Sequence, residues 1–148
     1  MLSMKAKYAL RALIFLARSS DKLHQIKNIS QECDIPYKFL ETIMQELRNH
    51  GILASKRGIF GGYYLAKEPI EISVGAVIRF IDGPLAPIRC ASVTAYQKCD
   101  DCKDEKTCEI RKIMIDVRNS ISNVLDSKTL HEIAELDFHR VDYLSYFI

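Results

Sequence analysis

The 148-residue sequence has no apolar run that approaches the roughly 20 residues a membrane-spanning helix requires. Its first five residues lead directly into an amphipathic pattern, without the cleavage site of a signal peptide. It also lacks a catalytic triad, a phosphate-binding glycine loop and a pair of carboxylates arranged for acid–base catalysis. These absences predict a cytoplasmic protein that is not an enzyme and has no membrane partner.

Charge is divided unevenly along the chain, although the net charge is only +2. Residues 1–67 hold eleven Lys or Arg against five Asp or Glu, whereas residues 68–148 hold ten against fourteen. A basic half suits a polyanion and an acidic half repels one. With 48% hydrophobic residues, the chain can bury a core and is expected to form one compact unit.

The segment 35–66 organises the sequence. Pro36 suits the first turn of a helix, because its missing N–H would have no partner there, and Gly51 suits a left-handed cap at the helix end. Between them, apolar residues recur at the spacing of one helix face: Phe39, Leu40, Ile43, Met44 and Leu47. Two short strands are expected over 52–56 and 63–66, joined by a glycine-rich turn with a basic tip. This is the outline of a winged helix-turn-helix, although an ordinary α+β segment has the same periodicity.

Two further helices are predicted upstream. The first begins at a Ser3 cap and runs to about Arg18. Its expected buried stripe is Ala6, Leu10, Leu13, Ile14 and Ala17. A short helix over 27–33 then turns through 34–35 into the helix after Pro36, which is the helix-turn-helix arrangement. Cys33, beside this turn, is expected to be a small buried apolar residue.

Side chains that can contact DNA are expected on the outward face of the second helix of this pair and at the hairpin tip. Glutamate, glutamine, lysine and arginine can read base edges or phosphates, and Arg57 beside glycine suits a minor-groove probe. The candidate DNA-binding residues are Tyr37, Lys38, Glu41, Thr42, Gln45, Arg48, Lys56, Arg57 and Gly58. A solvated helix face and a plain charged turn are the alternative interpretations.

The second half contains a helix predicted over 74–81, capped by Ser73 and ended by Asp82-Gly83-Pro84. The longest periodic run, 109–125, has an apolar stripe of about five turns: Ile110, Ile113, Met114, Val117, Ile121, Val124 and Leu125. A chain this small rarely needs so long a stripe for its own core, so we expect a homodimer. Thr129 and Glu132 form a capping-box pattern that starts another short helix. The sequence predicts no role for the aromatic tail, 138–148.

Four of the five cysteines, Cys90, Cys99, Cys102 and Cys108, lie in a segment without a sustained period. Their spacing is C-x8-C-x2-C-x5-C, and acidic residues rather than histidines stand among them. Four thiolates can hold an iron–sulfur cluster or a structural zinc ion. The C-x-x-C pair, Cys99 and Cys102, can also act as a thiol–disulfide switch. These three interpretations stay open on the residues alone.

Taken together, these motifs resemble the Rrf2 family of bacterial winged-helix regulators, whose members include IscR, NsrR and CymR. The resemblance covers nearly the whole chain. It is carried by Leu2-Ser3, 8–13, Ile35-Pro36, Phe39-Leu40-Glu41, Leu47, Gly51, 55–58, Gly61-Gly62-Tyr63, Leu65-Ala66, Ile72-Ser73-Val74, Asp82-Gly83-Pro84, the cysteine stretch and Thr129-Leu130. It implies that Glu41 and its helix neighbours enter the major groove of DNA. Arg57 and Gly58 would reach the minor groove from the wing.

The resemblance also favours the iron–sulfur interpretation of the cysteines. Cluster-binding relatives supply three cysteines and a different fourth ligand, sometimes a carboxylate near the N-terminus of the partner subunit. This chain has a fourth cysteine, and it places Lys7 and Tyr8 at the corresponding N-terminal position. Members that work mainly through a protein partner lack the cysteine loop.

The sequence therefore predicts a mainly α fold with a small β-hairpin wing. Its parts would be a winged helix-turn-helix DNA-binding domain (1–82), a cysteine-rich sensor loop (83–108), and a dimerisation helix with the C-terminal tail (109–148). The expected function is a homodimeric DNA-binding transcription regulator that senses redox, iron–sulfur or nitric oxide status. A zinc-stabilised or thiol-switched regulator is the alternative. A thiol or iron–sulfur electron-transfer protein is the other, although the C-x-x-C lacks the βαβ setting of a thioredoxin-like enzyme.

Overall fold

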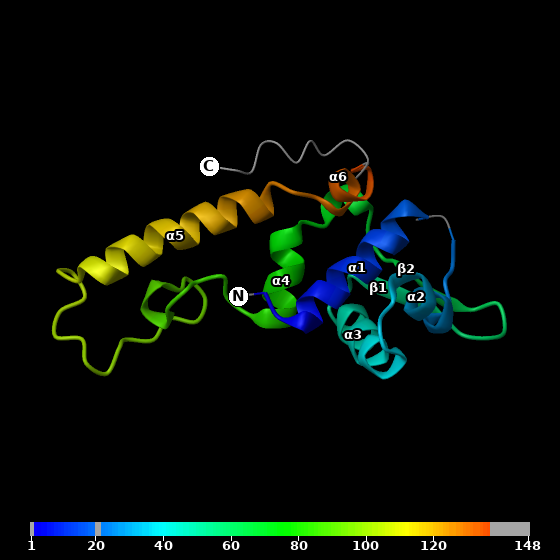
Figure 1. The fold of residues 1–148 in the computed structure, drawn as a ribbon, viewed down its shortest axis with the longest axis horizontal. Helices are drawn as coiled ribbons and strands as arrows, with labels where there is room; N and C mark the ends of the chain where they lie inside the picture. Colours follow the sequence, from blue (N-terminus) through cyan, green and yellow to red (C-terminus); the bar gives the residue numbers. More distant parts are fainter. Residues whose placement is uncertain (1, 20–21, 137–148) are drawn as a thin grey trace.

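The computed structural model describes residues 2–19 and 22–136, so the aromatic tail lies outside the described residues. The elements are α1 (Met4–Arg18), α2 (Ile26–Cys33), α3 (Tyr37–Asn49), β1 (Leu53–Lys56), β2 (Gly62–Leu65), η1 (Pro69–Glu71), α4 (Val74–Asp82), η2 (Arg89–Ala91), α5 (Glu109–Asp126) and α6 (Leu130–Ala134). The predicted mainly helical fold with a hairpin wing is confirmed (Figure 1).

The helix starts follow the capping residues that the sequence indicates. The backbone N–H of Ala6 donates to Ser3 Oγ at 3.0 Å, and that of Ala76 donates to Ser73 Oγ at 3.2 Å. Thr129 and Glu132 form the predicted capping box at the start of α6. Each cap satisfies a backbone donor that has no partner within its helix.

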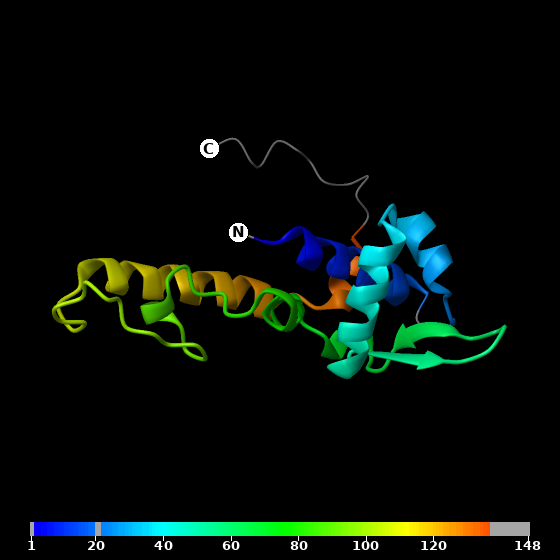
Figure 2. The same cartoon turned by 90° about the horizontal axis from the view of Figure 1, so that it is seen from below.

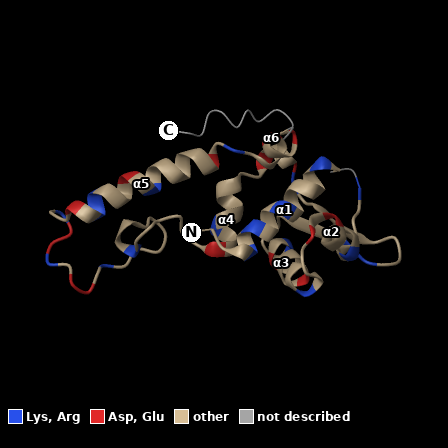
Figure 3. Cartoon of the chain, in the orientation of Figure 1, with Lys and Arg blue, Asp and Glu red and all other residues tan. Residues whose placement is uncertain are grey.

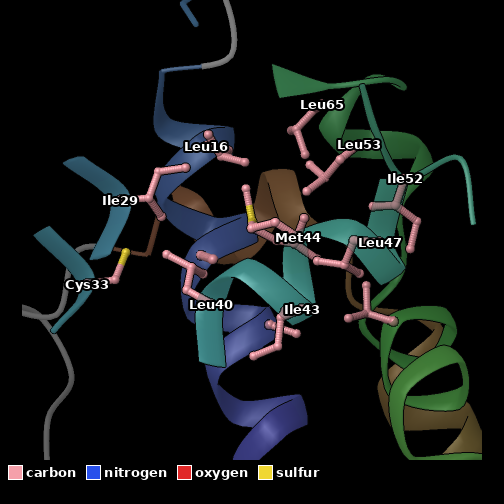
Figure 4. Packing of buried hydrophobic residues seen from close by; sticks show 14 of the residues in the cluster. Leu16, Ile29, Cys33, Leu40, Ile43, Met44, Leu47, Ile52, Leu53 and Leu65 are labelled. Carbon is pink, nitrogen blue, oxygen red and sulfur yellow. The ribbon is translucent and has the colours of Figure 1, made fainter. Parts of the chain in front are cut away.

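The hydrophobic core lies where α1, α2 and α3 meet the hairpin and α4 (Figure 4). Leu40, Ile43, Met44 and Leu47 are buried in it as predicted, but Phe39 is 62% exposed. Phe39 precedes Leu40 by one residue, which is about 100° around a helix, so it falls at the edge of the apolar stripe. Cys33 is buried as expected, and burial raises the pKa of its thiol.

The buried face of α1 differs in part from the predicted stripe. Ala6 and Leu13 are buried as expected, whereas Leu10, Ile14 and Ala17 are only half-buried. Their places are taken by Ala9, Ala12 and Leu16. Helix α1 packs against α3, α4 and α6, and three of its five buried residues are alanines, whose small side chains let helices approach one another. The predicted stripe favoured large side chains, so it missed Ala9 and Ala12 on the buried face of α1.

The hairpin pairs β1 with β2 in an antiparallel register that runs from Leu53 opposite Leu65 to Lys56 opposite Gly62. His24, between α1 and α2, adds a bridge to β2, where it exchanges backbone hydrogen bonds of 3.0 and 2.8 Å with Tyr63. A Cβ on Gly62 would lie 2.6 Å from the His24 carbonyl oxygen, so glycine permits this close approach. The segment before α2 is thus attached to the wing close to the turn of the hairpin.

The segment 83–108 runs away from the compact body, and α5 begins at its far end and runs back beside it towards α4 (Figures 1 and 2). After α5 the chain rejoins the compact body, where α6 packs on α1 and Leu130 is fully buried in the core. Arg18 Nε donates to the Ala134 carbonyl at 3.1 Å, which adds a polar contact to this return. None of the helices described for this chain combines the length and apolar character of a bilayer crossing.

One ion pair joins α4 to the end of α5. The Arg79 guanidinium donates hydrogen bonds of 2.6 and 2.8 Å to the two Asp126 carboxylate oxygens. This bond lowers the pKa of Asp126 below its ordinary value and raises that of Arg79. Gly75 allows the approach, because a Cβ there would lie 2.0 Å from Asp126 Oδ1.

The Asp126→Asn variant is expected to lose up to about 1 kcal/mol of unfolding free energy at neutral pH, since both partners are partly exposed. A carboxyl group with a lowered folded-state pKa contributes stability above its unfolded pKa of about 3.9, and this is lost as pH falls through the folded value. Urea unfolding at pH 7 and at steps down to pH 2.5 should show the difference from the parent shrinking on acidification. Asp116→Asn, an exposed carboxylate on the same helix, is the control. A difference at Asp126 that stays constant with pH would contradict this assignment.

Candidate nucleic-acid interface and cysteine loop

The outward face of α3 is polar along its length. All six side chains predicted to point outward are exposed: Tyr37, Lys38, Glu41, Thr42, Gln45 and Arg48. Glu46 is instead held by Lys5 of α1, with Nζ 2.7 Å from a carboxylate oxygen. The face thus presents amide, hydroxyl, carboxylate and cationic groups of the kinds that contact base edges and phosphates.

A basic groove of about 380 Å³ separates the wing from α2 and α3. Its lining contains four cations, and the residues are Gln25, Ile26, Lys27, Tyr37, Arg48, Ser55, Lys56, Arg57, Gly58, Gly61, Gly62 and Tyr63. Among these described lining residues none is acidic. Arg48 Nη1 donates to Ser55 Oγ at 3.4 Å, which links the end of α3 to β1. The groove therefore suits phosphate groups.

The structure brings five of the predicted DNA-binding residues into this groove: Tyr37, Arg48, Lys56, Arg57 and Gly58. Lys38, Glu41, Thr42 and Gln45 lie outside it, on the exposed helix surface. The other seven lining residues are not among the predicted DNA-binding residues, and they include the polar pair Gln25 and Lys27 at the start of α2. A cation in the first turn of the first helix of a helix-turn-helix is the signal that could have identified Lys27.

The cysteine loop brings two of its four thiols into contact. Cys90 in η2 is 4% exposed, and Cys99 Sγ lies 3.7 Å from its sulfur. Cys108 caps α5, because its sulfur accepts a hydrogen bond from the backbone N–H of Arg111 at 3.4 Å. The backbone N–H of Cys102 donates to the Cys99 carbonyl. Within residues 2–19 and 22–136, no three His, Cys, Asp or Glu side chains are grouped to hold a metal ion. Of the four thiols, Cys90 and Cys99 form the one sulfur–sulfur contact in the described part of the loop.

The geometry of this pair fits thiolate coordination. Two sulfurs that share a tetrahedral metal ion at about 2.3 Å stand about 3.8 Å apart, close to the spacing of Cys90 and Cys99. The hydrogen bond to Cys90, desolvation and nearby negative charges raise the pKa of the Cys99 thiol. Partial burial and the neighbouring Cys108 raise that of Cys102. A bound cation would supply the positive charge that such crowded thiolates need.

Two arginines tie this loop to α5. Arg111 Nε donates to the Cys90 carbonyl at 3.0 Å, and an Arg118 guanidinium N–H donates to the Ala91 carbonyl. Both arginines lie along one side of the helix, so the η2 turn that carries Cys90 is fixed to α5 at two points. The acidic residues of the loop lie farther out, near the far end of α5 (Figure 3). A conformational change at Cys90 would thus act directly on α5 through these two hydrogen bonds.

An apolar face of α5 has no covering element in the described chain. Helix α5 has no buried residue, and its exposed apolar side chains are Ile110, Ile113, Val117, Ile121 and Val124. At consecutive spacings of three or four residues they form one stripe. Beside it, Ile121 and Leu125 line a hollow of about 470 Å³ together with Leu2 and Ile78.

The sequence profile of the Rrf2 family, described as iron-dependent transcriptional regulators, matches residues 2–136. An rrf2-like HTH-type transcriptional regulator of Rhodobacter capsulatus is 45% identical over 136 residues, which are 89% of this chain and 91% of that protein. The solved structure of CymR (YrzC), the global cysteine regulator of Bacillus subtilis, has a TM-score of 0.74 at 32% identity and covers 90% of this chain and 95% of that one. IscR of T. potens has a TM-score of 0.73 at 28% identity, with 95% and 90% covered. The chain belongs to the Rrf2 family of transcription regulators, not to a family of enzymes.

Proposed function

We propose that this chain is a cytoplasmic, homodimeric regulator that binds duplex DNA through α3 and the wing under the control of an iron–sulfur cluster. The observation that carries the DNA-binding part is the basic groove, which joins the exposed polar face of α3 to the wing cations. Residues 1–82 would bind DNA, residues 83–108 would sense, and residues 109–148 would dimerise.

On duplex DNA, the outward face of α3 would enter the major groove, where Glu41 and Gln45 can meet base edges. Lys27 and Arg48 would contact phosphates on the strand between the grooves. Arg57, at the start of the wing turn, would reach the adjacent minor groove, whose negative potential attracts arginine. This arrangement uses three of the four cations that line the basic groove.

The iron–sulfur assignment rests on the four thiols and on the family's description as iron-dependent. Cys90, Cys99, Cys102 and Cys108 would hold the group, and it would supply a redox-sensitive cross-link between the loop segments. Zinc at the same thiols is the alternative cofactor. Arg111 and Arg118 would pass a change in the loop to α5, because they bind the consecutive backbone carbonyls of Cys90 and Ala91.

A thiol–disulfide switch is a second candidate, and a specific contact favours it. The Cys90 and Cys99 sulfurs, 3.7 Å apart, would need to approach to about 2.05 Å to form a disulfide. The similar protein CymR is named a global cysteine regulator. In this chain the thiol hydrogen bond joins Cys99 to Cys90, so oxidation should link this pair and leave Cys102 reduced. Mass mapping of peroxide-treated apoprotein distinguishes this pair from the Cys99–Cys102 pair.

The Arg57→Ala variant is expected to lose about 1–3 kcal/mol of binding free energy for a specific duplex, because a cation leaves the minor groove. The test uses duplexes that the full-length protein enriches from a random-sequence library, with affinity measured over a range of salt concentrations. The parent should show a steep decrease of log affinity with log salt, and the slope should be smaller by about one for Arg57→Ala.

Lys112→Ala is the matched control for this experiment, since it removes an exposed cation from α5, away from the basic groove. Its affinity and salt slope should equal those of the parent. Equal losses at Arg57 and Lys112 would mean that only net charge matters. Failure of the parent to enrich any duplex would overturn the proposed DNA-binding function.

A further inference from the structure

The tip of the wing carries two large apolar side chains that are almost fully exposed. Phe60 is 91% exposed and Ile59 is 85% exposed, the highest values for a large hydrophobic residue in the described part of the chain. The backbone N–H of Gly61 donates to the Gly58 carbonyl at 3.0 Å, which makes Ile59 and Phe60 the central residues of a tight turn. The turn lies at the far end of the hairpin, away from the helical body (Figure 2).

A side-chain hydrogen bond from α2 and two glycines fix the conformation of this turn. Gln25, at the start of α2, donates from Nε2 to the Ile59 carbonyl at 3.0 Å. Gly58 has a φ of +112°, and a Cβ on Gly61 would lie 2.0 Å from the Lys56 carbonyl oxygen. The turn therefore requires both glycines, and the contact from α2 fixes where the apolar pair stands relative to the helix-turn-helix.

The charge around the apolar pair indicates what it meets. Residues 47–67 contain Arg48, Lys56, Arg57 and Lys67 and no Asp or Glu. Three of these cations line the basic groove directly behind the tip. A partner that covers Phe60 must therefore be polyanionic outside and apolar inside, which describes stacked base pairs between phosphate backbones.

We propose that Phe60, with Ile59 beside it, enters the DNA minor groove as an apolar wedge between two base pairs and bends the duplex. The inference rests on the proposed DNA-binding function and deepens it, because it names the residue through which the wing reads DNA deformability. Phe and Ile are among the side chains that wedge between base steps from the minor groove. Pyrimidine–purine steps unstack most easily, so each binding site should place a TA or CA/TG step under the wing.

The test uses the full-length protein and a duplex that the parent enriches from a random-sequence library. Affinity is measured by fluorescence anisotropy, and bending is measured by energy transfer between dyes on the two duplex ends. Phe60→Ala should lower the affinity by about 10- to 100-fold and remove most of the bend. Phe60→Leu should keep most of the bend, because leucine can also act as a wedge. Replacing the flexible step by a stiff A-tract should weaken the parent and leave Phe60→Ala almost unchanged.

Ile70→Ala is the matched control, since Ile70 is also exposed but lies outside the wing, in η1. It should bind and bend DNA as the parent does. If Phe60→Ala binds and bends like the parent, the wedge is wrong while the DNA-binding function stands. If the parent enriches no duplex at all, the DNA-binding function fails, and the wedge fails with it.

Discussion

The double variant Val117→Glu/Ile121→Glu is expected to be monomeric and to lose specific DNA binding. Both side chains lie near the middle of the exposed apolar stripe of α5, four residues apart. In a two-fold dimer each would face the equivalent helix, so four glutamates would meet at one seam. An unpaired charge buried in this way costs several kcal/mol. Sedimentation velocity at micromolar concentration should give a dimer for the parent and a monomer for the variant.

The loss of DNA binding follows from geometry. A two-fold dimer presents two α3 helices to half-sites about one helical turn apart, roughly 34 Å, or a multiple of this distance. A monomer reads one half-site only, so its affinity for the full site should fall by orders of magnitude. Asn119→Glu/Asn123→Glu is the matched control, because it places two glutamates at the same spacing on another face of α5. A monomeric parent, or a variant that still dimerises, would contradict the dimer through α5.

Alanine at Cys90 or Cys99 is expected to abolish formation of the chromophore when the protein is reconstituted with iron and sulfide without oxygen. These two thiols form the preformed pair, and loss of either leaves too few thiolates for a four-thiolate site. The expected readout is loss of visible absorbance and of acid-labile sulfide, whatever the effect on DNA binding. Cys108→Ala should have the same effect on the chromophore, and it also removes the cap of α5.

Cys33→Ala is the control for the cysteine series. Cys33 is buried in the helical core, where its sulfur lies 3.8 Å from the Arg11 carbonyl oxygen. Alanine there should cost a modest amount of stability through the lost packing and leave the absorbance spectrum unchanged. Equal loss of colour from Cys33→Ala and Cys90→Ala would mean that misfolding, not loss of a ligand, explains the series.

The DNA-binding half followed from local signals in the sequence. Pro36, Gly51 and the spacing from Leu40 to Leu47 define α3 almost to the residue, because caps and periodicity act within the helix itself. The buried side of α1 did not follow in full, since it depends on which helices pack against it. Phe39 was misplaced for a related reason: an aromatic residue at the edge of a stripe has no local signal for the side it takes.

The cysteine loop was recognisable from composition, but its internal arrangement was not. Sequence spacing groups Cys99 with Cys102, whereas the structure places the Cys99 sulfur beside Cys90, nine residues upstream. That contact depends on the η2 turn, which α5 holds through Arg111 and Arg118. Contacts between a loop and a helix more than twenty residues away carry no periodic pattern. The predicted basic tip of the wing was wrong in one respect, because the tip itself carries Ile59 and Phe60 and Arg57 lies at the start of the turn. The exposure of Phe60 had no signal in the sequence, since exposure is a property of the folded hairpin.

In the proposed mechanism, the occupancy of the cysteine loop controls DNA binding. This control is tested most directly by comparing the affinities of anaerobically reconstituted and metal-free protein for the same enriched duplex. A switch from 1:99 to 99:1 between two conformations takes about 5.5 kcal/mol of free energy. A quarter of that free energy, about 1.4 kcal/mol, already changes the affinity about tenfold. We expect a brown protein with acid-labile sulfide and an affinity that differs at least about tenfold between the two forms. A protein that stays colourless, or two forms with equal affinity, would contradict it.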